Sequence, residues 1–86
     1  MGVARRQLLL KALSGTADAS IRFDGLRSLV KALGFVERVK GSHRLFTKRD
    51  VMEILNLQPR GSLAKPYRVK QVRAVIVRYT LSEGVQ

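Results

Sequence analysis

Apolar residues recur every three or four positions in two segments of the chain, which is typical of helices with one buried face. The first set is Leu26, Leu29, Val30 and Leu33, and the second is Val69, Val72, Val75, Ile76 and Tyr79. Asp24 stands where it would cap the start of the first helix, and Gly34 stands where that helix would end. Pro66 stands at the first position of the second helix, where its missing N–H has no cost.

Between these helices the pattern changes to the two-residue alternation of β-strands. Strands are expected at residues 35–39, 42–47 and 51–57, with turns at Lys40-Gly41 and at residues 48–50. Turns this short join neighbouring strands in antiparallel order. The sequence therefore predicts an antiparallel meander, followed by a loop over residues 58–65.

The front of the chain adds a helix at residues 3–13, ended by Ser14 and Gly15, and a polar connection up to Ser20. The predicted order is helix, three-stranded antiparallel sheet, helix, with the additional N-terminal helix before it. Two helices on one face of such a sheet make an α+β two-layer domain, an order shared by double-stranded-RNA-binding domains. We expect one compact domain, in which residues 1–20 are the N-terminal helix and connection and residues 21–82 the main unit.

Charge is the unusual part of the composition. The 86 residues include 17 Lys and Arg but only 6 Asp and Glu, a net charge of +11, which points to an anionic partner: DNA, RNA or membrane. Membrane is disfavoured because the longest apolar runs, Leu8–Leu10 and Val75–Val77, are far too short to span a bilayer. The chain has no cysteine, which excludes a disulfide framework, a cysteine nucleophile and a thiolate zinc site, and favours the cytosol.

The basic residues gather in two runs that contain no acidic residue. The first is Arg38, Lys40, Arg44, Lys48 and Arg49, and the second is Arg60, Lys65, Arg68, Lys70, Arg73 and Arg78. A charge run is often no more than a solvated surface, but two such runs in one small domain favour binding of phosphate groups. Most of the few aromatic residues are expected in the core, so the nucleic-acid backbone should supply most of the affinity.

His43 is the single histidine and lies within the first basic run, directly after the turn. A lone histidine is usually a surface or packing residue, yet this setting suits a base. Neighbouring cations disfavour a further positive charge on the imidazole, so we expect His43 to be neutral and able to accept a proton. Gly41 would allow a phosphate to approach the backbone closely.

No metal or other cofactor is expected. The carboxylates are scattered and no second histidine is present to complete a metal site. An enzyme with these residues would use general acid–base chemistry with cationic stabilisation. RNA permits this, because its 2′-hydroxyl can attack the adjacent phosphate once a base removes the proton.

Several stretches resemble the HicA toxins of bacterial toxin–antitoxin systems, over about residues 21–81. They are Leu33-Gly34-Phe35, Lys40-Gly41-Ser42-His43 with Phe46, Ile54 to Pro59, Ala64 to Tyr67, and Val69 to Arg73. The resemblance implies a double-stranded-RNA-binding-like fold, cleavage of mRNA in the bacterial cytoplasm and neutralisation by a HicB-type antitoxin. It implies that the family's catalytic histidine corresponds to His43 and its preceding glycine to Gly41.

The chain departs from many family members in one respect: Arg44 stands where they have a second histidine. Arg44 would then steady the charge on the phosphate, while the general acid is left open between a lysine, Tyr67 and solvent. The residues expected to bind RNA are Lys40, Gly41, Ser42, Arg44, Lys65, Lys70 and Arg73. The alternatives are a double-stranded-RNA-binding module without catalysis and, more remotely, a ribosome-associated structural protein.

Overall fold

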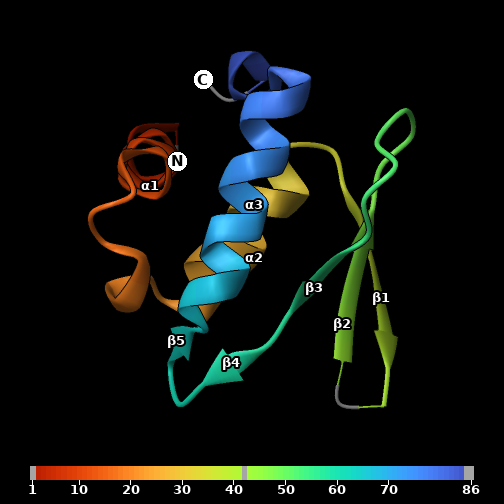
Figure 1. Cartoon of the computed structure of the whole chain (residues 1–86), viewed down its shortest axis with the longest axis horizontal. Helices are drawn as coiled ribbons and strands as arrows, with labels where there is room; N and C mark the ends of the chain where they lie inside the picture. The colour runs from red at the N-terminus through yellow and green to blue at the C-terminus, as the bar shows by residue number, and fades with distance from the viewer. Residues whose placement is uncertain (1, 42, 85–86) are drawn as a thin grey trace.

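A computed structural model describes residues 2–41 and 43–84. Within these residues, three α-helices and a three-stranded antiparallel sheet form a small α+β fold (Figure 1). The helices are α1 (Gly2–Ser14), α2 (Phe23–Ala32) and α3 (Pro66–Tyr79). The sheet contains β1 (Val36–Lys40), β2 (His43–Thr47) and β3 (Leu55–Leu57), and a separate short hairpin contains β4 (Pro59–Arg60) and β5 (Leu63–Ala64). Single turns of 3-10 helix lie at Asp18–Ser20 and Leu81–Gly84.

The sheet is the predicted meander, with β2 between β1 and β3. The β1–β2 register runs from Val36 opposite Thr47 to Lys40 opposite His43. The third strand is shorter than predicted, because only residues 55–57 pair with β2. Residues 51–54 instead run toward α3, where Tyr79 donates a hydrogen bond of 2.7 Å from its hydroxyl to Glu53.

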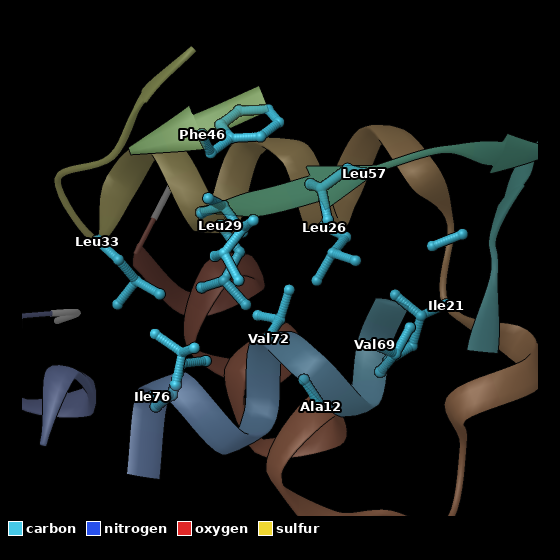
Figure 2. Packing of buried hydrophobic residues seen from close by; sticks show 14 of the residues in the cluster. Ala12, Ile21, Leu26, Leu29, Leu33, Phe46, Leu57, Val69, Val72 and Ile76 are labelled. Atoms are coloured by element: carbon cyan, nitrogen blue, oxygen red, sulfur yellow. The ribbon is translucent and has the colours of Figure 1, made fainter. Parts of the chain in front are cut away.

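One hydrophobic core joins the sheet to all three helices. Figure 2 shows the labelled side chains from α1, α2, α3, β2 and β3 converging on this core. Phe46 of β2 is buried, and so are four of the five α3 residues predicted to face inward, which are Val69, Val72, Val75 and Ile76. The fifth, Tyr79, is partly buried against the same core. Ala12 of α1 is also fully buried, so the front helix contributes to the same core.

The helix boundaries are largely as predicted. Residues 3–13 lie within α1, and Pro66 begins α3. Gly34 ends α2 with a φ of 103°, in the left-handed region that glycine adopts without strain. These ends follow from local backbone preferences, which is why the sequence alone located them.

The structure corrects two predictions, one about the start of α2 and one about the segment that contacts it. Asp24 is not the capping residue, because α2 begins at Phe23 and Arg22 occupies the N-cap without a side-chain hydrogen bond. Residues 58–65 are not a plain loop, because they contain the β4–β5 hairpin. The hairpin explains the missing cap: the carbonyl oxygen of Ser62 accepts a 3.0 Å hydrogen bond from the backbone N–H of Phe23, which otherwise has no partner within the helix.

Two arginines bind one carboxylate of the sheet, and one of them joins α2 to it. Glu37 of β1 accepts hydrogen bonds of 2.6 and 2.7 Å from Arg27 of α2, and Arg44 of β2 contacts the same carboxylate at 3.0 Å. Only 10% of the Glu37 side chain is exposed. The hydrogen bonds from Arg27 lower the pKa of Glu37 most, and Arg44 lowers it further, while desolvation raises it. The net effect is a pKa lowered from 4.5 to about 2.

Replacing this carboxylate should destabilise the fold. We expect Glu37→Gln to lower the free energy of unfolding by about 1.5–3 kcal/mol, the range for hydrogen bonds to charged groups. Because folding lowers the pKa of Glu37, its contribution is complete above pH 4.5 and is lost as the pH falls toward about 2. Urea unfolding at neutral and acidic pH measures the difference between the two proteins, which should shrink on acidification.

The matched control is Asp50→Asn, which removes the same charge from an exposed residue. Asp50 has a φ of 70°, a conformation that Asn also tolerates. Equal losses of stability in the two variants would show that net charge, rather than the contacts of Glu37, governs the effect.

Candidate functional site

His43 is the first residue of β2 and lies on the sheet face that points away from the helices. Successive side chains of a strand alternate between faces, so the buried side chain of Phe46 places His43 on the opposite side. Lys40 pairs directly with His43 across the β1–β2 ladder, so both side chains share this outer face. The histidine is exposed to solvent.

Two amides from the end of the sheet contact the imidazole. Continuing the β2–β3 register by one residue beyond Leu57 places Gln58 opposite His43. The side-chain nitrogen of Gln58 lies 2.9 Å from Nδ1 of His43, and that of Asn56 lies 3.4 Å from the same atom. The side that carries Nδ1 therefore contacts the protein.

Gln58 connects His43 to the start of α3. Its side-chain oxygen accepts a 3.2 Å hydrogen bond from Nζ of Lys65 and a 3.4 Å hydrogen bond from the hydroxyl of Tyr67. Lys65 immediately precedes α3, and Tyr67 lies in its first turn. We call the four residues His43, Gln58, Lys65 and Tyr67 the histidine network.

A shallow hollow adjoins the histidine network. It has a volume of about 400 Å³ and is lined by Arg60, Lys65, Pro66 and Tyr67. The guanidinium of Arg68 lies 4.5 Å from the centre of the Tyr67 ring, so a cation stacks on this exposed aromatic side chain. Figure 1 shows that the β1–β2 turn, β4 and the start of α3 lie at the same end of the molecule.

Two polar atoms beside the histidine network are buried without a hydrogen-bond partner among the described residues. They are Oδ1 of Asn56, whose amide nitrogen contacts His43, and Nε of Arg68, which stacks on Tyr67. Buried polar groups are nearly always paired, so each of these two atoms could form a hydrogen bond with a bound ligand or a water molecule. One of these atoms is an acceptor and the other a donor.

Most cations at this end of the molecule are available to a ligand. Within residues 2–41 and 43–84, no ion pair to a carboxylate is formed by Lys40, Arg60, Lys65, Arg68 or Lys70. The carboxylates of Asp18, Glu37 and Glu53 instead bind arginines at junctions between elements. The surface around His43 is therefore strongly positive.

The structure brings together some of the predicted site residues and separates others. His43 and Lys65 belong to the histidine network, and Lys40 lies across from His43. Gly41 has a φ of 62° at the turn, with no atom within 4 Å of where a Cβ would lie. Lys70 is exposed on α3, one turn beyond Tyr67. Ser42 lies outside the described residues.

Arg44 lies on the other face of the sheet from His43. As the next residue of the same strand it points toward α2, where it binds Glu37 at 3.0 Å. The role expected for Arg44, to steady the charge on a phosphate held at His43, does not fit this placement. Arg60 and Arg68 are better placed among the arginines, because they lie beside the hollow and Tyr67.

Arg73 is a structural residue, which corrects the expectation that it faces RNA. Its guanidinium lies 2.7 Å from the carboxylate of Asp18 and donates a 3.2 Å hydrogen bond to the carbonyl oxygen of Ala12. Only 23% of its side chain is exposed. Arg73 therefore joins α3 to the end of α1 and the connection that follows it.

The sequence prediction did not include Gln58, Asn56 or Arg60 among the site residues. A signal for Gln58 was present, because an antiparallel ladder that pairs Phe46 with Leu55 must bring residue 58 opposite residue 43. The predicted turn over residues 48–50 gives a different register, in which residue 55 rather than residue 58 lies opposite residue 43.

Comparison with known proteins leaves the chain without a match: no family model, no curated protein and no solved structure is significantly similar to it. None of the helices in the described ranges has the length and apolar character needed to cross a membrane. In the part of the chain that the structure describes, no three His, Cys, Asp or Glu side chains gather into a possible metal site.

The contrast between Arg73 and Lys70 can be tested by stability. We expect Arg73→Gln to lower the free energy of unfolding by about 1.5–3 kcal/mol, because it leaves Asp18 and the Ala12 carbonyl without their donor. Lys70→Gln removes the same charge from an exposed position and should change stability by less than about 0.5 kcal/mol. Urea unfolding of the two variants measures both values, and similar values would contradict the structural role of Arg73.

Proposed function

We propose that this protein is a metal-independent endoribonuclease, the toxin component of a HicA-type toxin–antitoxin system, with His43 as its general base. The observation that carries the proposal is the histidine network, which joins the single imidazole to a lysine and a tyrosine on a surface rich in available cations. Supporting it are the glycine–serine–histidine element and the other stretches that resemble HicA toxins. The order α2, β1, β2, β3, α3 is also that of a double-stranded-RNA-binding domain.

The proposed reaction uses the 2′-hydroxyl of RNA as the nucleophile. His43 takes its proton, the 2′-oxygen bonds to the adjacent phosphorus, and the bond from phosphorus to the 5′-oxygen breaks. The departing 5′-oxygen takes a proton from Lys65, Tyr67 or water. His43 then returns its own proton to solvent, and the acid regains one from solvent. The products are a 2′,3′-cyclic phosphate and a 5′-hydroxyl.

The surroundings of His43 suit the substrate of this reaction. Cations near a phosphate that becomes more negative in the transition state lower the barrier electrostatically. Lys40 and Lys65 lie on either side of the imidazole, and Arg60 lines the neighbouring hollow. The exposed ring of Tyr67 offers a surface on which an unpaired base can stack.

The proposal includes a protein partner. A surface that cuts cellular RNA must be covered when idle, and the resemblance implies a HicB-type antitoxin in the bacterial cytoplasm. We propose that this antitoxin presents acidic residues to the cations around His43 and covers the imidazole. Complementary charge would make the two proteins associate rapidly and in a salt-dependent way.

A second candidate is a double-stranded-RNA-binding module without catalysis, in which His43 is one more phosphate contact. The occupied Nδ1 of His43 favours it, because an imidazole whose lone pair already accepts a hydrogen bond is not free to accept a proton there. The two functions differ in a simple outcome: only the ribonuclease changes the length of the RNA.

The chemistry of cleavage gives the sharpest test. Cleavage should persist in excess EDTA, should leave 2′,3′-cyclic phosphate ends, and should fail where the substrate carries a 2′-deoxy sugar. His43→Ala should lower the cleavage rate about 10²–10⁴-fold, the usual effect of removing a general base. Rates are measured on end-labelled RNA, and growth arrest on expression should be relieved by the same substitution.

His43→Ala also provides its own control. Because His43 is exposed, the variant should keep its stability and nearly all of its RNA affinity. A His43→Ala protein that cuts RNA at the wild-type rate would move the active site elsewhere. Wild-type binding without any cleavage would favour the binding module.

RNA affinity should depend on the cations near the histidine network. The logarithm of affinity should fall linearly with the logarithm of salt concentration. Lys65→Gln and Lys70→Gln should each reduce the slope by about 0.7–0.9, the value for one phosphate contact. Lys11→Gln on α1 is the matched control and should leave the slope unchanged, since α1 lies away from the β1–β2 hairpin (Figure 1). A wild-type slope near zero would contradict the proposal that the cations bind RNA phosphates.

A further inference from the structure

The orientation of the Gln58 amide is determined by the group that binds its other end. A lysine ammonium can only donate hydrogen bonds. Lys65 Nζ lies 3.2 Å from one atom of the amide, so that atom must be the oxygen. The NH₂ group of Gln58 then faces His43, with its nitrogen 2.9 Å from Nδ1.

This orientation determines where the neutral imidazole carries its proton. An NH₂ group donates, so Nδ1 of His43 must accept and cannot hold a hydrogen. The proton of the neutral ring therefore resides on Nε2. A ring in this tautomer offers an N–H donor at Nε2 and has no lone pair there to take a proton from a 2′-hydroxyl.

We infer that Gln58 is a positioning residue that holds His43 in the inactive tautomer, and that the hydrogen bond from Lys65 holds the Gln58 amide in the orientation required. Of the two groups that donate to the Gln58 oxygen, only Lys65 lacks the ability to accept. The hydroxyl of Tyr67 can accept a hydrogen bond as readily as donate one. Removing Lys65 from the amide therefore leaves Gln58 free to rotate by half a turn.

Rotation of the amide would activate His43. The Gln58 oxygen would then face Nδ1 and accept a hydrogen bond from a proton located there, while the NH₂ group would donate to Tyr67. The ring would carry its proton on Nδ1 and present a free lone pair at Nε2. One proton leaves Nε2 for solvent and one arrives at Nδ1 from solvent, so the charge of the ring does not change.

A phosphate group is the ligand expected to draw Lys65 away from Gln58. This step rests on the proposed function: a phosphate of bound RNA attracts the ammonium of Lys65, which lines the hollow beside Tyr67 and has no carboxylate partner among the described residues. Lys65 would leave the Gln58 oxygen, and His43 would become a base only when substrate is present. A free protein would then hold its imidazole in a form that does not attack.

Nitrogen-15 NMR tests the inference directly, because the chain contains a single histidine and its two ring nitrogens give one pair of signals. Long-range proton–nitrogen correlation, at an alkaline pH where the ring is neutral, reports which nitrogen carries the proton. The free wild-type protein should show Nε2 protonated and Nδ1 unprotonated. Protonation of Nδ1 in the free protein would overturn the inference, whatever the protein does to RNA.

Two substitutions test the roles of Gln58 and Lys65 in setting the tautomer of His43. Gln58→Glu keeps an acceptor for Lys65 and Tyr67 but replaces the NH₂ group 2.9 Å from Nδ1 with an acceptor, which is nearer than the Asn56 amide at 3.4 Å, so the proton should move to Nδ1. Lys65→Met should raise the fraction of Nδ1-protonated ring well above its wild-type value. The matched controls are Gln7→Glu on α1 and Lys70→Met on α3, both exposed, which should leave the spectrum unchanged. Wild-type spectra in Gln58→Glu or Lys65→Met would overturn the inference.

The last measurement adds RNA whose 2′-oxygens are methylated, so that it binds without being cut. Binding should move the proton of His43 from Nε2 to Nδ1, as Lys65→Met does. Binding without that shift would overturn the coupling to substrate. Failure of the RNA to bind at all would overturn the proposed function and the coupling with it. The spectra of the free proteins would still decide which residues set the tautomer of His43.

Discussion

The two-residue period of β2 is the constraint on which both the core and the candidate site depend. Phe46 is fully buried among the helices, and this fixes the face on which every other side chain of the strand lies. Arg44 must then point toward α2 and His43 must point away from it. A shift of register by one residue would exchange these roles, exposing Phe46 and burying the imidazole.

Carboxylates are scarce in this chain, and the structure uses them where elements meet. Glu37 holds α2 to the sheet, Asp18 holds α3 to the connection that follows α1, and Glu53 holds the segment before β3 to α3. Each of the three binds an arginine, and Arg27 and Arg73 make the paired hydrogen bonds to a carboxylate that a lysine does not make. The end of the molecule near His43 thereby keeps its cations, which supports the proposed affinity for phosphates.

Local signals in the sequence were sufficient for most of the fold. The helical spacing of Val69 to Tyr79 and the glycine at position 34 depend on backbone geometry that any chain obeys, and both were located correctly. The errors concern features set by distant contacts. Arg73 resembles a surface cation in sequence, and only the packing of α1 against α3 brings Asp18 to it. Gln58 was missed because its role depends on Lys65, His43 and the β2–β3 register together.

The position of α3 in chain order has a consequence for the nascent protein. The hairpin that carries His43 leaves the ribosome before Lys65 and Tyr67 are exposed, and before the four buried residues of α3 can complete the core. A partly synthesised chain therefore has an imidazole without the packed domain and without the cations at the start of α3. The proposed RNA site is thus assembled only after α3 has been synthesised and packed, although its histidine is made earlier.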